Sequence, residues 1–297
     1  DADAATWVAL LLTLHYGFTR RAQLYNHNSV LIAFVALTVL ATLYAMRDQK
    51  NWQWLGVGLL AGLSLLVKYQ AAVPLIGVLV AIAVSGHLRQ SAKGLIGAGI
   101  ICLAVLTPHV WWLTQHDFQA LRYALHYLNA PDLSEQTLRQ GSFWVALVRY
   151  HLPMFFFVLI LWAIGFVRST PRLGQPAKSW SNKQKGWLVG LLIFPLAFIV
   201  FVSLAMGVRV QSQWGLQTSQ FLTLALAYWM CFKFGQPTVT HLWAWGLVQA
   251  AALLIFIGQG LGWILYDNDR LAVRELPARQ IASRAESFWN SQTHCPL

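Results

Sequence analysis

A lysine at the end of an apolar stretch is the residue whose type and position most directly suggest chemistry. Lys68 follows an apolar run that begins at Trp54. As a helix this run rises only about 21 Å, against about 30 Å for a hydrocarbon core, so we expect Lys68 below the outer membrane surface and within the protein. A cation at that depth needs a partner, and a phosphate suits a compact ammonium. The alternative is that Lys68 only snorkels to the interface.

A cluster of hydrogen-bonding side chains precedes the apolar stretch that begins at Ser29. It consists of Tyr25, Asn26, His27 and Asn28. A neutral His27 can accept or donate a proton and orient a hydroxyl group, so it is a catalytic candidate. Asn28 is a second one, unless it only caps the following helix. Tyr25 is a candidate contact for a sugar or a lipid.

Acid, base and anion-binding groups also gather where another apolar stretch ends. His109 and Asp117 are candidates for proton transfer, and Arg122 is a candidate for binding phosphate. The pair Trp111 and Trp112 fits an aromatic belt at the membrane surface, and Trp111 is also a candidate contact for a sugar or lipid. The spacing of the histidines around one aspartate matches no metal signature, so no metal is expected.

Arg209 and Trp214 form the last candidate group, as a phosphate ligand and as a surface on which a sugar ring can stack. Tryptophan is also common at membrane interfaces, which is the alternative for Trp214. The chain has no Ser-His-Asp triad pattern, phosphate-binding P-loop or dinucleotide fingerprint, and no cofactor is expected. Together the four groups predict a cavity near the outer membrane face, suited to a lipid-linked phosphate and a sugar.

The elements that must position these residues are membrane spans. Of the 297 residues, 57% are hydrophobic and 10% are charged, whereas a soluble domain has about 25% charged residues. The segment 54–85 can be one long helix or two spans. Two spans are favoured because they place the basic residues on one side. The sequence predicts an all-α, polytopic integral membrane bundle of about nine spans, at 4–18, 29–46, 54–67, 71–85, 94–113, 143–167, 187–206, 216–234 and 241–266.

The net charge of +11 raises the question of nucleic-acid binding, but its distribution argues against it. The basic residues lie between spans, where the positive-inside rule explains them by orientation in the membrane. The expected partners are membrane lipids, and nucleic acid is excluded. The residues expected on the cytoplasmic side are Arg47, Lys50, Arg89, Lys93, Arg168, Arg172, Lys178, Lys183, Lys185 and Lys233.

Two regions are expected along the chain. Residues 1–266 form the membrane domain, and residues 267–297 begin a soluble segment on the outer, periplasmic side. The chain starts at Asp1 and stops inside a polar stretch. We therefore expect a piece of a longer protein that lacks its first spans and part of its C-terminal region, and that is inactive by itself.

Three short motifs resemble bacterial family 39 glycosyltransferases, integral membrane enzymes of the GT-C fold. The resemblance extends to protein O-mannosyltransferases and to the aminoarabinose transferase that acts on lipid A. It covers most of the chain, although the motifs are degenerate and indicate the superfamily better than the substrate. The motifs are Asn26-His27-Asn28-Ser29-Val30-Leu31, the stretch from Gly58-Leu59-Leu60-Ala61-Gly62-Leu63 to Val67-Lys68-Tyr69, and Pro108-His109-Val110-Trp111-Trp112.

The resemblance implies a polyprenyl-phosphate-linked sugar as donor. It also implies an acceptor, lipid A or another envelope component, on the periplasmic side of the bacterial inner membrane. Lys68 matches the family's lysine near the donor phosphate, and Tyr69 is a candidate sugar or lipid contact. The acidic residue usually assigned as catalytic base lies on an outer loop that would precede Asp1. A second acid of the family is replaced here by residues 26–28.

The resulting hypothesis is a glycosyltransferase that works by direct displacement at the anomeric carbon. An upstream carboxylate or His27 would deprotonate the acceptor hydroxyl. Lys68, with Arg122 or Arg209, would stabilise the departing phosphate. Two alternatives use the same spans: a transporter or flippase of lipid-linked sugars, and a noncatalytic assembly subunit.

Overall fold

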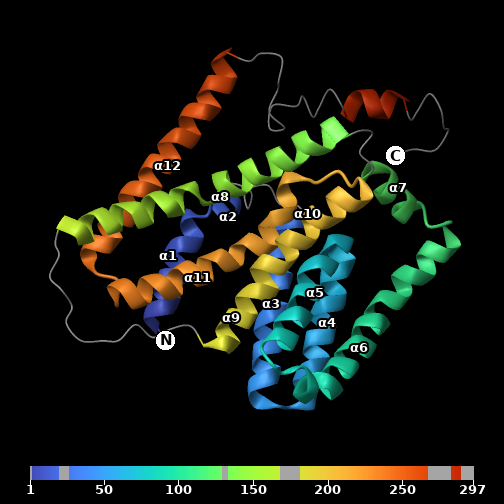
Figure 1. Ribbon diagram of the computed structural model, residues 1–297. Coiled ribbons are helices and arrows are strands. Elements are labelled where there is room, and N and C mark those ends of the chain that lie inside the picture. Colours follow the sequence, from blue (N-terminus) through green and yellow to red (C-terminus); the bar gives the residue numbers. More distant parts are fainter. Residues whose placement is uncertain (1, 20–26, 129–132, 168–180, 267–281, 289–297) are drawn as a thin grey trace. The chain divides into compact units, whose positions relative to one another are not determined.

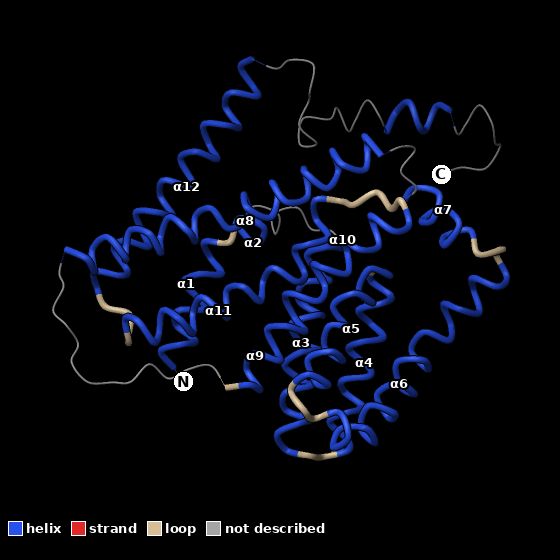
Figure 2. Tube along the Cα trace, viewed as in Figure 1, coloured by secondary structure: helices blue, strands red, loops and turns tan. Residues whose placement is uncertain are grey.

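The computed structural model describes residues 2–19, 27–128, 133–167, 181–266 and 282–288, and every regular element in these ranges is a helix (Figures 1 and 2). The predicted all-α class is confirmed. The chain divides into two compact units, Asp1–Gly246 and Leu247–Leu297. All the candidate site residues that the structure describes belong to the first unit.

Among the described residues, five helical segments are long and apolar enough to cross a membrane: α3, α6, most of α8, the continuous stretch from α9 to α10, and the first part of α12. Shorter apolar helices occupy the predicted spans 54–67 and 71–85 and the first part of the predicted span 4–18, which is interrupted at His15. The predicted span 216–234 corresponds to α11, which is not among the candidates. The polytopic membrane class is confirmed. The elements are α1 (Ala2–Leu14), α2 (Tyr16–Thr19), α3 (His27–Asp48), α4 (Asn51–Val67), η2 (Tyr69–Ala71), α5 (Ala72–Val84), α6 (Leu88–Gln115), α7 (Gln119–Leu128), α8 (Leu133–Val167), α9 (Asn182–Leu188), η3 (Val189–Ile193), α10 (Phe194–Met206), η4 (Ser212–Gly215), α11 (Leu216–Phe234) and α12 (Val239–Tyr266).

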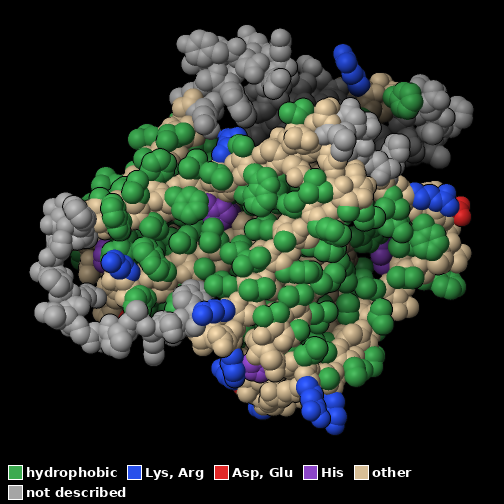
Figure 3. All heavy atoms as spheres, viewed as in Figure 1, with side chains coloured by type: hydrophobic (Ala, Val, Ile, Leu, Met, Phe, Trp, Pro, Cys, Tyr) green, Lys and Arg blue, Asp and Glu red, His purple; other side chains and the backbone are tan. Residues whose placement is uncertain are grey.

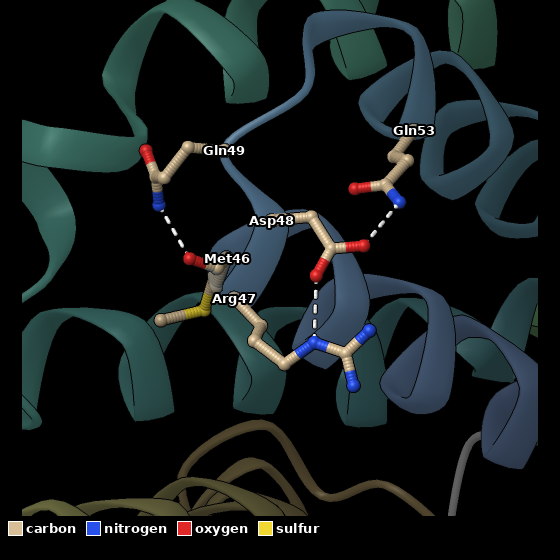
Figure 4. Close-up of polar contacts among 5 residues, drawn as sticks. All are labelled: Met46, Arg47, Asp48, Gln49 and Gln53. Carbon is tan, nitrogen blue, oxygen red and sulfur yellow. Dashed lines mark hydrogen bonds and ion pairs between the residues drawn. The ribbon is translucent and has the colours of Figure 1, made fainter.

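A tight turn joins α3 to α4, and polar contacts hold it (Figure 4). Gln49 adopts a left-handed φ of 55°, and its side chain donates a hydrogen bond to the Met46 carbonyl. The Asp48 carboxylate accepts hydrogen bonds from Arg47 Nε at 2.6 Å and from Gln53 Nε2 at 2.8 Å. The chain therefore reverses at this point, and α4 packs along α3.

Close packing of α4 against α6 depends on small residues, as expected for helices that associate without a hydrophobic driving force. A Cβ atom at Gly58 would overlap the carbonyl oxygen of Ala98, and the Trp54 indole fills the space beside Gly94. Trp54 is only 3% exposed although it stands near the start of α4. The same device joins α5 to the π-helical turn η3, where Gly77 and Gly190 face each other.

Six basic residues at described helix ends and turns lie at one end of the first unit. The start of α4 meets the start of α6 through Trp54 and Gly94, and the start of α9 meets the end of α5 through Gly186 and Ser85. Lys and Arg side chains accordingly appear near the α3–α4 turn in Figure 3, at the edge of a largely hydrophobic face. This end carries Arg47, Lys50, Arg89, Lys93, Lys183 and Lys185.

The second unit contains the remainder of α12 and a short helix at residues 282–288, whose side chains are exposed. The predicted outer segment 267–297 lies outside the described residues except for this helix. The predicted cytoplasmic residues Arg168, Arg172 and Lys178 lie outside them as well.

Candidate functional site

Three consecutive residues between α4 and α5 connect three other parts of the bundle. The helical chain breaks at Lys68, whose backbone is extended (φ −167°, ψ 131°). Lys68 Nζ donates to Asn28 Oδ1 on α3 at 2.9 Å. The Tyr69 hydroxyl lies 2.6 Å from His109 Nε2 on α6, and Gln70 Nε2 donates to the Trp214 carbonyl on η4 at 3.2 Å. The break therefore brings four sequence clusters to one place.

The Lys68 ammonium is half-buried and oriented by a neutral partner. Asn28 is 5% exposed, in the first turn of α3. Its amide oxygen uses one of the three N–H donors of the ammonium, which leaves the others available. In the described part of the chain no carboxylate lies within ion-pair distance of Lys68. The arrangement suits an incoming anion.

His27 stands beside this cation at the first position of α3. Its side chain is exposed, and it is near enough to Lys68 for the two to interact electrostatically. An exposed imidazole next to an ammonium can exchange a proton with a hydroxyl group bound beside it. The structure thus brings three predicted residues together: His27, Asn28 and Lys68.

A row of aromatic rings runs from Tyr69 along the C-terminal end of α6. The His109 ring is stacked against Trp112 at a centroid distance of 6.0 Å, and Trp112 is stacked against His116 at 4.4 Å. His116 Nδ1 lies 2.8 Å from the Trp112 carbonyl. Because that carbonyl can only accept, His116 Nδ1 is the donor in this contact and Nε2 is left for another partner. Two imidazoles therefore lie on the same face of α6 as the Tyr69 hydroxyl.

Other predicted site residues lie outside this contact network. Trp111 is 68% exposed. Asp117 occupies the corner after α6 with a left-handed φ of 49°, and Arg122 is exposed on α7. Tyr25 lies outside the described residues. Trp214 belongs to the network through its backbone carbonyl, while its ring packs against a buried cluster of Phe143, Leu147, Ile199 and Val210.

Arg209 forms an ion pair with Glu135, which was not among the predicted site residues. Its Nη2 lies 3.1 Å from Glu135 Oε2 on α8, and Arg139 approaches the other oxygen at 3.4 Å. The side chain of Gln136 donates to the Ser203 carbonyl, which ties the same turn of α8 to α10. Arg209 therefore anchors the loop after α10 to α8.

Two features of this region have no signal in the sequence. Gln70 lies two residues after Lys68, but its contact with Trp214 spans 144 positions. A pair of buried histidines, His15 and His151, lies with ring centroids 4.6 Å apart between α1, α8 and α11.

Within the described ranges, no group of three His, Cys, Asp or Glu side chains is arranged to hold a metal ion.

Residues 1–112 match the family model described as dolichyl-phosphate-mannose-protein mannosyltransferase. These residues include Lys68, Asn28, Tyr69 and His109. The chain is similar to membrane glycosyltransferases of the GT-C type.

A second similarity is to lipid A galacturonosyltransferase RgtD of Rhizobium johnstonii, with 25% identity over 148 residues. The aligned part is 50% of this chain and 31% of the relative, so the chain spans about a third of the relative it matches. No solved structure gives a significant match. The predicted resemblance to GT-C-type glycosyltransferases is confirmed by the two matches.

Proposed function

We propose that the protein of which this chain is part is a membrane glycosyltransferase. It moves a sugar from a polyprenyl-phosphate-linked donor to a lipid, glycan or protein acceptor at the periplasmic face of the bacterial inner membrane. The observation that carries the proposal is the Lys68 ammonium at a helix break, held by Asn28 with no carboxylate beside it in the described residues. Such a cation in a membrane bundle requires an anionic partner, and a lipid-linked phosphate supplies one at this depth.

In the proposed reaction the acceptor hydroxyl attacks the anomeric carbon, the bond from that carbon to the phosphate oxygen breaks, and polyprenyl phosphate leaves. Negative charge grows on the phosphate as the bond breaks, and Lys68 stabilises it there. The acceptor proton passes to a base. His27 and His109 are the described candidates, beside a carboxylate expected upstream of Asp1.

Two different observations support the proposed acceptor and the proposed side of the membrane. The similarity to a lipid A galacturonosyltransferase supports a lipid of the cell envelope as acceptor. The basic residues at the opposite end of α4 from Lys68 support a periplasmic site, because positively charged turns are retained in the cytoplasm. The donor needs no cofactor in this scheme.

The test is transfer of labelled sugar from polyprenyl phosphate to endogenous lipid, in membranes that contain the full-length protein. Lys68→Ala should lower turnover by at least about a hundredfold, because a charge-assisted contact to the leaving phosphate is lost, while Lys68→Arg should retain part of it. Lys50→Ala, at the other end of α4, is the matched control and should be unaffected.

Near-normal turnover in Lys68→Ala, with normal insertion, would remove Lys68 from the site. Translocation of the intact donor across the bilayer without a labelled product would instead identify a flippase.

A further inference from the structure

Helix α7 has a polarity pattern unlike that of the spans. At about 100° per residue, Ala120, Leu121, Ala124 and Leu125 fall within an arc about 140° wide, and Gln119, Arg122 and Tyr123 occupy the opposite side. The spans, by contrast, are apolar on most sides. A helix of this kind needs a boundary between an apolar and a polar medium.

The depth of α7 follows from the helix before it. The apolar part of α6, residues 95–113, rises about 28 Å, which matches a hydrocarbon core of about 30 Å. Lys93 stands at the inner end of that part, and Gln115 and His116 stand beyond its outer end. Because α6 qualifies as a membrane span, its last turn reaches the headgroup layer, and α7 begins four residues after Gln115.

The corner between the two helices turns the chain out of the direction of α6. Asp117 and Phe118 both have left-handed φ angles, 49° and 53°, and the Phe118 amide donates to the Leu113 carbonyl at 2.9 Å. A left-handed corner with this hydrogen bond ends a helix abruptly. Figure 1 shows α7 leaving the axis of α6 at this corner.

Large side chains on the apolar side of α7 remain exposed in the described part of the protein. Leu121 is 40% exposed, Leu125 is 57% exposed and Phe118 at the corner is 41% exposed. They continue the exposed surface of α6, where Trp111 and Ile100 are more than half exposed. A protein surface of this composition beside a lipid-facing span is covered by lipid.

We propose that α7 binds the outer surface of the bilayer and lies in the headgroup layer parallel to it. Leu121 and Leu125 enter the acyl-chain boundary, and Arg122 lies among the lipid phosphates. A helix with an apolar face and a basic polar side binds in this way, buried about 5–10 Å into the boundary. The Trp111–Trp112 pair directly before the corner stands at the depth where aromatic belts are found.

This placement determines the depth of the candidate site in the membrane. The row from Tyr69 to His116 ends next to α7, so an interfacial α7 holds it at the level of the lipid phosphates. The inference depends on α6 being a span and does not depend on transferase activity. It can therefore fail or succeed independently of the proposed function.

The experiment uses the full-length protein in liposomes of phosphatidylethanolamine and phosphatidylglycerol, with Cys102, Cys231 and Cys295 replaced by Ser. A nitroxide is attached at one introduced cysteine at a time. The apolar side is represented by Leu121→Cys and Leu125→Cys, and the polar side by Gln119→Cys and Tyr123→Cys. Ile100→Cys in the middle of α6 is the reference for the bilayer interior. Collisions with oxygen, which concentrates in lipid, are compared with collisions with a water-soluble nickel chelate.

The ratio of oxygen to nickel collisions should be at least about fivefold higher at 121 and 125 than at 119 and 123, with both apolar positions shallower than 100. Equal, nickel-dominated collisions at all four positions would overturn the proposal, because α7 would then stand in water. Low collision rates with both reagents at 121 and 125 would also overturn it, because α7 would then be covered by protein.

Discussion

Replacing Asn28 tests whether Lys68 binds an anion, because the relative transfer activity of two Asn28 variants depends on it. Its amide oxygen accepts a hydrogen bond from Lys68 Nζ at 2.9 Å. Asn28→Ala removes that contact and should raise the donor KM about tenfold, since a hydrogen bond to a charged group contributes about 1.5–3 kcal/mol. Asn28→Asp keeps the shape but adds a negative charge at the same distance from the ammonium.

The negative charge introduced by Asn28→Asp is the change that tests whether Lys68 binds an anion. At 2.9 Å and an effective dielectric constant near 20, two unit charges attract by roughly 5–6 kcal/mol before desolvation is counted. If about half of this remains, a donor phosphate that must displace the carboxylate loses about a hundredfold in affinity. Asn28→Asp should therefore impair transfer more than Asn28→Ala, and at the same time raise the thermal unfolding temperature.

The assay is label transfer from polyprenyl-phosphate sugar, with KM and kcat measured separately, and thermal unfolding in detergent for the same variants. Thr38→Ala is the control, because Thr38 is buried on the same helix and its hydroxyl donates to the Phe34 carbonyl of that helix. If Asn28→Asp transfers sugar as well as or better than Asn28→Ala, Lys68 meets no anion and the reasoning is refuted.

Two further predictions concern the hydroxyl of Tyr69 and the contact between α5 and η3. Tyr69→Phe keeps the ring but removes the hydroxyl that lies 2.6 Å from His109 Nε2, so kcat should fall about tenfold with little change in KM; an unchanged kcat would mean that Tyr69 only contacts lipid. Gly190→Ala places a methyl group against the Ala81 backbone and the Gly77 carbonyl, which should destabilise the fold by about 1–3 kcal/mol. Gly99→Ala, with open space at its Cβ position, is the control in the same thermal unfolding measurement, and equal unfolding temperatures would contradict the tight α5–η3 contact.

The sequence was sufficient for the positions of several apolar helices. Predicted ranges such as 29–46 and 94–113 lie within α3 and α6, because a helix rising 1.5 Å per residue must be apolar over the thickness of the bilayer. The division at Lys68 was also predictable, since two spans place the basic turns on one side. These are local properties, and they can be read from neighbouring residues.

Arg209 shows where such local reasoning ends. Its type and loop position predicted a phosphate ligand, and the structure pairs it with Glu135, 74 positions away. Nothing near either residue in the chain signals this pair. The partner depends on how α8 packs against the end of α10, where Gln136 and Ser203 also meet.

By itself the sequence determined the all-helical membrane class, the approximate positions of several apolar helices and the presence of a cation at the end of a short apolar run. Only the tertiary structure decided that Asn28, His109 and Trp214 meet the residues 68–70, over separations of 40 to 144 positions. The physical reason is that hydropathy depends on each residue and its neighbours. Which helix faces which depends on where small residues such as Gly58 and Gly190 let two backbones approach.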